Sequence, residues 1–272
     1  MPMNKQDKLR PSDAATRHLV RRLVDEPERW ALFLDIDGTL LDLAATPDAI
    51  QVPLSLPATL DAVSARLGGA LALVTGRSLP FADGLFAPFR FPIAGLHGAE
   101  FRGTDGATSV VSVTPAFAAL KQRLAERTAW MEGVLIEDKG AAVAAHYRLA
   151  PAYDTALEKI MRDFAEEAGP AWVLQPGKMV FEIRPARADK GEAVATYLEQ
   201  PAFAGRLPIA IGDDLTDETM FALANARGGQ SIRVGSLATA TCALAKASSP
   251  SAIRSALATI AAAGDRKATA AS

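Results

Sequence analysis

Two aspartates, Asp35 and Asp37, stand one residue apart at the end of an apolar run, in the stretch "FLDIDGTLLD". On an extended backbone, residues two apart face the same side, so both carboxylates should project together from backbone positions about 6–7 Å apart. Asp213 and Asp214 follow another apolar run and would join them. Carboxylates this close raise one another's pKa unless a cation lies between them. Because oxygen ligands favour Mg²⁺ and leave room for a phosphate, we predict a magnesium site.

Such a site is suited to phosphoryl transfer through a covalent intermediate. With the metal screening the charges, Asp35 could attack phosphorus and form an aspartyl-phosphate. Asp37 would protonate the leaving alkoxide and then take a proton from the attacking water. The hydroxyl of Thr75 and the amide of Gly76 follow a further apolar run and could hold phosphoryl oxygens. Lys190 opens a helix in the capping-box sequence "DKGE", and its charge would stabilise the transferring phosphoryl group.

The elements that position these residues are short apolar runs at 30–34, 70–74 and 207–211. None alternates cleanly, which is typical of strands buried on both faces of a parallel sheet. Helix-like segments at 56–67 and 190–199 lie between them, and strand and helix alternating in this way indicate an open α/β sheet. Ligands of such sheets bind at the carboxyl ends of the strands, so the polar residues after each run should meet in one crevice.

The segment from about residue 106 to 185 has a different secondary-structure pattern from the parallel-sheet core. Its strands are adjacent in sequence and joined by short turns, which favours antiparallel pairing, and two helix-like stretches accompany them. Turn-rich residues at both ends, 103–106 and 185–189, would connect it to the core. We therefore predict an α/β fold with a Rossmann-like parallel-sheet core and an inserted α/β cap domain made of an antiparallel sheet plus two helices. The predicted boundaries are a helical N-terminal extension at 1–29, the core at 30–105 and 186–262, the cap at 106–185, and a flexible tail at 263–272.

Charged residues share one face of the strands in this cap. Lys178, Glu182 and Arg184 alternate with apolar residues, His146 and Arg148 do the same in another strand, and Glu137 and Lys139 also share a side. A face of this kind could satisfy the hydroxyls of a sugar and the charge of a phosphate. The same pattern fits the solvated face of an antiparallel sheet equally well, so the residues alone leave both interpretations open.

Composition excludes other classes of function. The 272 residues are 49% hydrophobic and 22% charged with a formal net charge of -2, which provides no global field for nucleic acid or an anionic membrane. One cysteine, Cys242, excludes an internal disulfide framework and a cysteine-rich metal site. The first residues lack the apolar core of a secretory signal, and no stretch approaches the ~18 apolar residues of a membrane span. We expect a cytoplasmic protein that binds neither nucleic acid nor membrane.

Four ordered motifs, "DIDGT", "VTGR", "DKG" and "GDDLTD", resemble those of the haloacid dehalogenase-like (HAD) phosphatases. The resemblance implies that Asp35 is the nucleophile and Asp37 the acid/base. It also implies that Mg²⁺ is held by Asp35, the backbone carbonyl of Asp37, and Asp213, with Asp214 and Asp217 supporting the metal. Thr75 stands where many relatives carry serine, a change that keeps the hydroxyl.

Three further segments, "GLHGAE", "EDKGAAVAAHYR" and "GKMVFEIRP", resemble the signature segments of the trehalose-6-phosphate phosphatases, over nearly the whole folded chain. This resemblance implies a small-molecule sugar phosphate as substrate. The residues that it assigns to the trehalose hydroxyls are Glu137, Lys139 and Glu182. It assigns Arg148 and Lys178 to the phosphate side, and it places His97 and Glu100 at the floor of the site, although His97 taken singly fits a packed structural histidine better. Arg77 either contacts substrate, which we favour, or pairs with a core carboxylate.

The expected reaction is hydrolysis of trehalose 6-phosphate to trehalose and phosphate. Alternatives are a phosphatase for sucrose phosphate or a glycosylglycerate phosphate, and a non-catalytic sensor of the sugar phosphate. A receiver domain phosphorylated on aspartate would also use clustered acids, but the inserted domain and the Asp-x-Asp spacing argue against it. No synthase domain is present in the sequence, so coupling to trehalose-phosphate synthesis would need a separate protein. We expect a monomer, although the sequence does not determine the oligomeric state.

Overall fold

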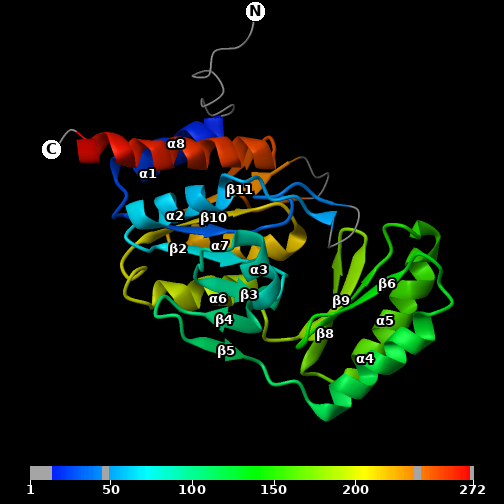
Figure 1. Cartoon of the computed structure of the whole chain (residues 1–272). Coiled ribbons are helices and arrows are strands. Elements are labelled where there is room, and N and C mark those ends of the chain that lie inside the picture. Colours follow the sequence, from blue (N-terminus) through cyan, green and yellow to red (C-terminus); the bar gives the residue numbers. More distant parts are fainter. Residues whose placement is uncertain (1–13, 45–48, 236–239, 270–272) are drawn as a thin grey trace, which may run out of the picture.

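The computed structural model describes residues 14–44, 49–235 and 240–269, and within these ranges it contains two β-sheets (Figure 1). The larger sheet has eight strands in the order β12-β11-β10-β1-β2-β3-β4-β5, and the smaller has four in the order β6-β7-β9-β8. The strands of the larger sheet are β1(Trp30–Leu34), β2(Leu71–Val74), β3(Ile93–Gly95), β4(Glu100–Arg102), β5(Thr108–Val110), β10(Leu207–Gly212), β11(Gln230–Val234) and β12(Ala245–Ala247). The strands of the smaller sheet are β6(Leu135–Asp138), β7(Val143–His146), β8(Trp172–Gly177) and β9(Val180–Pro185).

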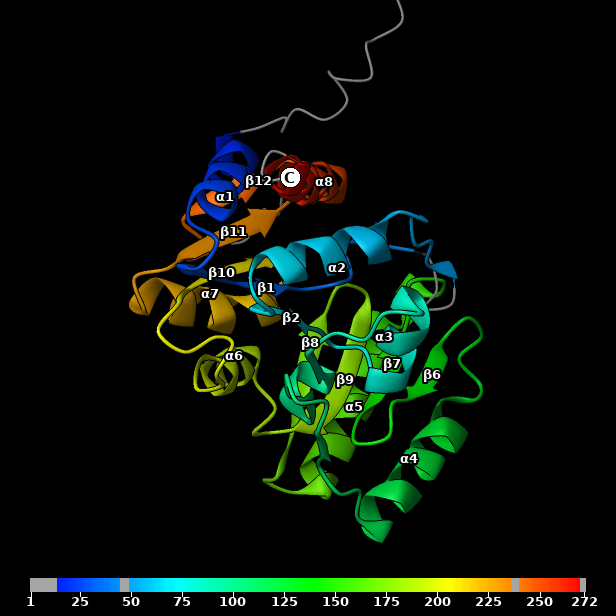
Figure 2. The same ribbon diagram turned by 60° about the vertical axis from the view of Figure 1, so that its left-hand side comes forward.

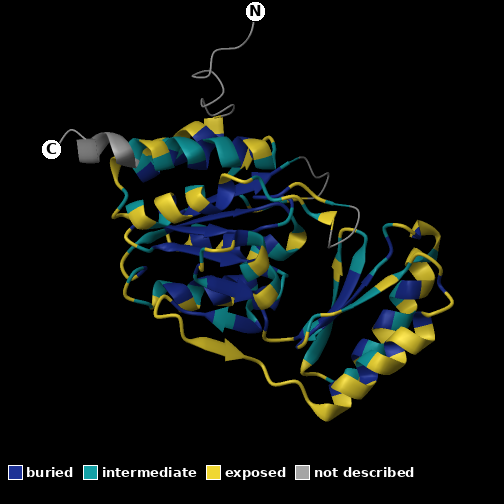
Figure 3. Cartoon of the chain, in the orientation of Figure 1, coloured by how far each residue is buried: buried dark blue, intermediate teal, exposed yellow. Residues whose placement is uncertain are grey.

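The larger sheet is parallel from β12 to β3, as the apolar runs predicted. Every residue of β1 and β2 is buried, because helices cover both faces (Figure 3). One group of helices lies on each face, with α1, α2 and α8 packed together on one side and α6 against α7 on the other (Figure 2). The helices are α1(Ala14–Asp25), α2(Leu56–Arg66), α3(Leu79–Phe86), α6(Lys190–Leu198), α7(Glu218–Ala226) and α8(Pro250–Thr269), with short 3₁₀ turns η3(Leu96–Gly98) and η5(Leu215–Asp217).

Strand β5 belongs to the core sheet, although we expected the residues from 106 onward to lie in the cap. It pairs antiparallel with β4, with Arg102 opposite Thr108. The turn between them is closed by hydrogen bonds from the amide of Gly103 to the carbonyl of Ala107 and from the amide of Gly106 to the carbonyl of Gly103. Gly106 has a φ of 80°, a conformation that favours glycine, so this turn makes a hairpin rather than a domain connection.

The smaller sheet forms a separate domain with the helices α4(Pro115–Thr128) and α5(Asp154–Ala168) and the 3₁₀ turn η4(Pro151–Tyr153). All of its strand pairs are antiparallel. Alternate residues of β7 and β9, such as Val143 and Phe181, pack with α4 and α5 in a second apolar core. The period-two pattern therefore directs the charged residues to the opposite face, which is turned toward the larger sheet (Figure 1).

Helices lie near both ends of the described chain. Helix α1 buries Leu19 and Leu23 within the predicted N-terminal extension, whose residues 1–13 lie outside the described part. Helix α8 continues to Thr269, so it includes most of the segment that we expected to be a flexible tail. In the parts of the chain that the structure describes, no helix combines the length and the apolar character needed to cross a bilayer.

Candidate active site

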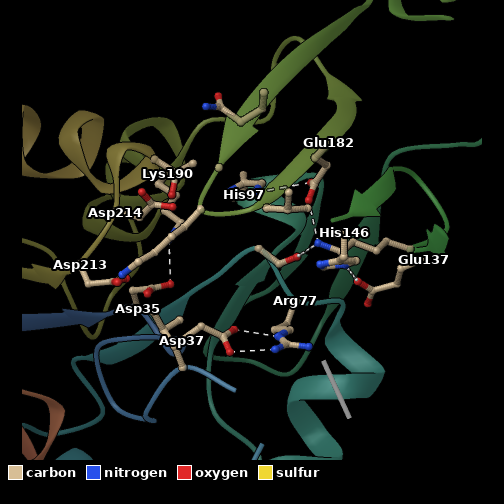
Figure 4. A pocket seen from close by; sticks show the side chains of 18 of the residues that line it. Asp35, Asp37, Arg77, His97, Glu137, His146, Glu182, Lys190, Asp213 and Asp214 are labelled. Atoms are coloured by element: carbon tan, nitrogen blue, oxygen red, sulfur yellow. Dashed lines mark hydrogen bonds and ion pairs between the residues drawn. The ribbon is translucent and has the colours of Figure 1, made fainter. Parts of the chain in front are cut away.

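A buried lysine joins two carboxylates at the carboxyl end of the parallel strands, and Figure 4 shows its contact with one of them, Asp35. The ammonium of Lys190 donates to Oδ1 of Asp35 over 2.8 Å and to Oδ1 of Asp217 over 2.6 Å. Asp35 follows β1, Asp217 lies in η5 after β10, and Lys190 is the first residue of α6. At most 4% of each of these three residues is exposed. The crevice predicted from the strand ends is therefore where these groups meet.

The local sequence explains how Lys190 reaches this position. The side chain of Asp189 accepts hydrogen bonds from the amides of Gly191 and Glu192, which caps the N-terminus of α6. Gly191 has to be small, because a Cβ there would lie 2.8 Å from the carbonyl oxygen of Thr219 at the start of α7. The "DKG" motif therefore fixes the helix start and lets α6 approach α7 closely.

Two other glycines make room for the acidic residues. Gly38 has a φ of 75°, and a Cβ on it would lie only 2.1 Å from Oδ2 of Asp213. A Cβ on Gly212 would lie 2.2 Å from Cγ of Asp217. Oδ2 of Asp217, the oxygen that does not contact Lys190, accepts from the amides of Asp213 and Asp214 over 2.8 and 2.9 Å. The glycines in "DGT" and "GDD" therefore allow the carboxylates to approach one another and the backbone.

The charges of this cluster fit a divalent cation. Asp35, Asp213 and Asp217 each offer a carboxylate oxygen, and these atoms all lie within 4.8 Å of one another. Three carboxylates and one ammonium leave two negative charges uncompensated. Burial, opposed by the charge of Lys190 and reinforced by Asp217 and Asp213, raises the pKa of Asp35 well above its ordinary value. A hard, divalent ion that takes oxygen ligands would relieve this repulsion.

Asp217 belongs to this cluster, although the motifs implied only a supporting role. Both of its oxygens are already engaged, one by Lys190 and the other by two backbone amides. Asp213 is buried against Gly38 and its carboxylate is free of such bonds within the described residues, so it is the better placed ligand. Asp214 instead caps η5 by accepting from the amide of Leu215. The division into ligands and supporting residues stays a prediction.

In the metal-free protein, Asp213→Asn should stabilise the fold at high pH and have little effect at low pH. Burial, followed by the charges of Asp217 and Asp214, raises the pKa of Asp213 from 3.8 to about 7. Between these values the folded state binds more protons, so the free energy of unfolding from this group falls as the pH rises. Thermal melts in chelating buffer should show a gain in Tm of roughly 3 °C or more at about pH 8 and none at about pH 4. An equal gain at both would contradict the assignment.

Asp37 is turned away from the cluster and pairs with Arg77. Nε and one terminal nitrogen of the guanidinium donate to its two oxygens over 2.7 and 2.8 Å. The guanidinium also stacks over the ring of Phe81, 4.5 Å from its centroid. Of the two roles considered for Arg77, the structure shows pairing with a core carboxylate. Contact with substrate stays a prediction, and the same holds for the backbone carbonyl of Asp37 as a metal ligand.

The Thr75–Gly76 turn lies beside this pair. Thr75 is fully buried, and its hydroxyl oxygen accepts from the amide of Arg77 over 3.1 Å. The carbonyl of Gly76 accepts from the ammonium of Lys139, which comes from the cap, over 3.1 Å. The turn is therefore compact and in direct contact with both domains, as a phosphate-holding turn between them would have to be.

Across the pocket, the cap presents two carboxylates with basic partners. Lys139 donates to Oε2 of Glu182 over 2.7 Å, and Nε2 of His146 lies 2.8 Å from Oε2 of Glu137. Burial opposes ionisation of Glu182, but the charge of Lys139 and the nearby His97 ring hold its pKa well below the ordinary value. Burial likewise opposes ionisation of Glu137, yet His146 and Lys139 lower its pKa. Both groups are therefore ionised acceptors at neutral pH.

The remaining predicted cap residues lie around the β8–β9 turn. Lys178 is exposed at this turn, close enough to Asp213 for its charge to oppose the rise in that carboxyl's pKa. Arg148 donates to the carbonyls of Ala44, in the core, and Lys178. The cap therefore also contacts the core at this side of the pocket.

Of the two residues assigned to the floor of the site, His97 lines the pocket and Glu100 does not. His97 is buried, and its Nε2 lies 3.5 Å from Oε1 of Glu182. Burial, only partly offset by Glu182, lowers the pKa of His97. Glu100 accepts from the amide of Leu79 at the start of α3 over 2.6 Å, so its carboxylate holds a helix end rather than facing the pocket.

Core and cap together line one open pocket, whose lining includes Asp35, Asp37, Asp213, Glu137, Glu182 and further residues of both domains. The lining also includes residues that sequence reasoning did not assign to the site, among them His146 and Gln175. The alternation of β7 placed His146 on the correct face, but its partner Glu137 lies on another strand. Gln175 lies opposite Glu182 in the sheet register, which no local pattern reveals.

Solved structures place this architecture in a known class. A phosphatase of the haloalkanoate (HAD) superfamily from Bacteroides thetaiotaomicron superimposes with a TM-score of 0.59 at 16% identity, over 86% of this chain and 96% of that one. The C-terminal domain of Candida albicans trehalose-6-phosphate phosphatase gives 0.79 at 22% identity, over 90% and 96%. At these identities the match shows the fold alone, which this chain shares with both proteins.

Sequence comparison gives the family. The trehalose-phosphatase family model matches residues 33–257. A probable trehalose-phosphate phosphatase of Sinorhizobium fredii is 60% identical over 234 residues, 86% of this chain and 88% of the relative. Trehalose-6-phosphate phosphatase of Escherichia coli is 41% identical over 221 residues, 80% and 83% of the two chains. The chain belongs to the trehalose-phosphatase family, and it is therefore a phosphoric monoester hydrolase.

Proposed function

We propose that this enzyme hydrolyses trehalose 6-phosphate to trehalose and inorganic phosphate, in a Mg²⁺-dependent reaction through an aspartyl-phosphate on Asp35. One observation carries the proposal. A single pocket has the Asp35 carboxylate cluster on its core side and, on its cap side, two ionised carboxylates that each contact a basic side chain. The first set suits a phosphoryl group, and the second suits sugar hydroxyls. Membership of the trehalose-phosphatase family supports the same substrate.

In the first step, a carboxylate oxygen of Asp35 forms a bond to phosphorus while the bond from phosphorus to the sugar oxygen breaks. Asp37 gives a proton to that oxygen, so trehalose leaves as a neutral alcohol. Both oxygens of Asp37 accept from Arg77 in the structure, so at least one of these bonds has to open before the proton is transferred. Lys190, which already donates to Asp35, offsets the negative charge that gathers around the phosphoryl group.

In the second step, a water molecule attacks phosphorus and Asp37 takes one of its protons. The bond between phosphorus and Asp35 breaks, which releases phosphate and restores the carboxylate. The hydroxyl of Thr75 and the amide of Gly76 would hold phosphoryl oxygens in both steps, because they lie at the end of β2 beside Asp37 and Arg77. Closer contact between cap and core would exclude other water from the reacting groups.

The residues that would hold Mg²⁺ are Asp35, Asp213 and the backbone carbonyl of Asp37, supported by Asp214 and Asp217. When bound, the ion supplies positive charge that neutralises the carboxylates and the phosphoryl oxygens. Removing divalent ions with a chelator should lower the rate of phosphate release at least about 10³-fold, and adding Mg²⁺ should restore it. Full activity in the chelated enzyme would contradict the metal requirement.

On the cap side, Glu137, Lys139 and Glu182 would hold the sugar hydroxyls, while Arg148 and Lys178 would reach toward the phosphate side. Glu182 has the strongest support. It is buried, its Oε2 is held by Lys139, and its Oε1 has no hydrogen-bond partner among the described residues. A buried acceptor left without a partner is destabilising. A ligand hydroxyl that donates a hydrogen bond to this oxygen therefore strengthens the binding of the ligand.

Glu182→Gln should therefore lower kcat/KM for trehalose 6-phosphate by about 10²-fold, because one charged acceptor and its fixed orientation are lost. Hydrolysis of p-nitrophenyl phosphate, which has no sugar, should fall much less. Glu166→Gln on the exposed side of α5 is a matched control and should change neither reaction. Equal losses on both substrates would indicate that Glu182 only maintains the fold.

A further inference from the structure

The Thr75–Arg77 turn is held by a strained segment on its other side. The amide of His97 donates to the carbonyl of Thr75, and the amide of Leu96 donates to the carbonyl of Arg77, both over 2.9 Å. Leu96 and His97 have φ values of 47° and 59°, a backbone conformation that residues other than glycine rarely adopt. Strain of this kind persists where the surrounding structure enforces it, and it is concentrated at functional sites.

The strained backbone directs the ring of His97 onto Gly76 and toward the cap. A Cβ on Gly76 would lie 2.9 Å from Nε2 of His97, so the ring packs directly on the turn. The same nitrogen lies 3.5 Å from Oε1 of Glu182, as the dashed line in Figure 4 shows. His97 therefore contacts the turn assigned to the phosphate and the carboxylate assigned to the sugar.

Lys139 makes a second connection between the same two groups. Its ammonium donates to Oε2 of Glu182 and to the carbonyl of Gly76. Glu182 and Gly76 are therefore joined twice, once through Lys139 and once through the His97 ring. Only the His97 connection is incomplete, because 3.5 Å is long for a hydrogen bond and Oε1 of Glu182 and Nδ1 of His97 are buried without partners among the described residues.

We propose that His97 is a positioning residue that couples the sugar subsite to the phosphate subsite. A sugar hydroxyl that donates a hydrogen bond to Oε1 of Glu182 would hold the carboxylate and the His97 ring in one fixed arrangement. Because the His97 ring and backbone hold the Thr75–Arg77 turn, the phosphate-holding groups become fixed at the same time. This inference rests on the proposed function. It adds that bound trehalose tightens the binding of phosphate, and that the trehalose part of the substrate raises the rate at which the enzyme hydrolyses trehalose 6-phosphate.

The test measures the binding of inorganic phosphate, with Mg²⁺ present, in the absence and in the presence of saturating trehalose, by calorimetry on the full chain. For the unmodified enzyme we expect trehalose to lower the Kd of phosphate about tenfold, within the usual range of coupling between sites. His97→Asn and His97→Gly both suit the left-handed backbone and remove the contacts of the ring. In each of them the effect of trehalose should fall below about twofold.

His97→Gln keeps a side-chain donor of comparable reach, so part of the coupling should return in it. A merely structural role for His97 would lower the Tm and weaken both ligands without changing the ratio of the two Kd values. Trehalose binding without coupling in the unmodified enzyme, or coupling retained in both His97→Asn and His97→Gly, would overturn the inference. Phosphate binding with no trehalose binding would instead overturn the proposed substrate, and with it this inference.

Discussion

Asp35→Asn should abolish phosphate release, with a loss of at least about 10⁴-fold in kcat, while the protein stays folded. The amide has nearly the volume of the carboxylate but cannot form the bond to phosphorus that both steps require. It also removes one of the negative charges that the metal ion would neutralise, so metal binding should weaken as well. Phosphate release under saturating trehalose 6-phosphate and Mg²⁺ measures the loss.

The same substitution should leave the stability of the metal-free protein unchanged or raised. Burial and the charges of Asp217 and Asp213 raise the pKa of Asp35 despite Lys190, which means that the charged form is disfavoured in the fold. Lys190 keeps its second partner, Asp217, when Asp35 is neutral. Asp61→Asn on the exposed side of α2 is the matched control. Activity of Asp35→Asn within about 100-fold of the unmodified enzyme would exclude Asp35 as the nucleophile.

Lys190→Met should lower kcat at least about 10³-fold and destabilise the metal-free protein by about 3–5 kcal/mol. Methionine fills the space but leaves Asp35 and Asp217 buried with no cation between them. Burial opposes the charge of Lys190, yet the two aspartates raise its pKa well above the ordinary value of 10.5. The stability that Lys190 provides is therefore fully present at neutral pH and is lost only as the pH rises beyond that value.

Urea unfolding at neutral pH with a chelator present would measure this loss, and the assay with Mg²⁺ would measure activity. Lys246→Met, at an exposed position of β12, is the control and should change neither quantity. Adding Mg²⁺ should return part of the stability of Lys190→Met, because the ion neutralises the same carboxylates, but it should not restore the rate. A variant that keeps activity within tenfold would show that Lys190 only balances charge.

The parts of this site that sequence alone predicted are those encoded next to buried strands. Asp35, Thr75 and Asp213 each follow an apolar run, and parallel strands bring their carboxyl ends to one edge of a sheet. The capping residue Asp189 likewise fixed Lys190 at a helix start. Fold class and the meeting of these residues were predictable because both follow from local patterns combined with one general rule of sheet topology.

Contacts between distant positions were not predictable in this way. The pairing of Asp37 with Arg77 joins residues 40 positions apart, and nothing in either neighbourhood distinguishes it from contact with substrate. His146 and Glu137 meet across two strands, and their register is fixed only in the folded cap. Strand β5 shows the same limit, because its pattern suits either sheet and the turn at Gly106 decides which one it joins.

The most direct measurement is the initial rate of phosphate release from a panel of sugar phosphates, each with Mg²⁺ and with a chelator. The panel contains trehalose 6-phosphate, sucrose phosphate, a glycosylglycerate phosphate and glucose 6-phosphate. We predict a kcat/KM for trehalose 6-phosphate at least about 10²-fold above every other member, and no turnover without the metal, because the hydroxyls of trehalose would pair with the cap-side carboxylates. Equal rates across the panel, or preference for another member, would contradict the proposed substrate, and binding of trehalose 6-phosphate without turnover would identify a sensor instead of an enzyme.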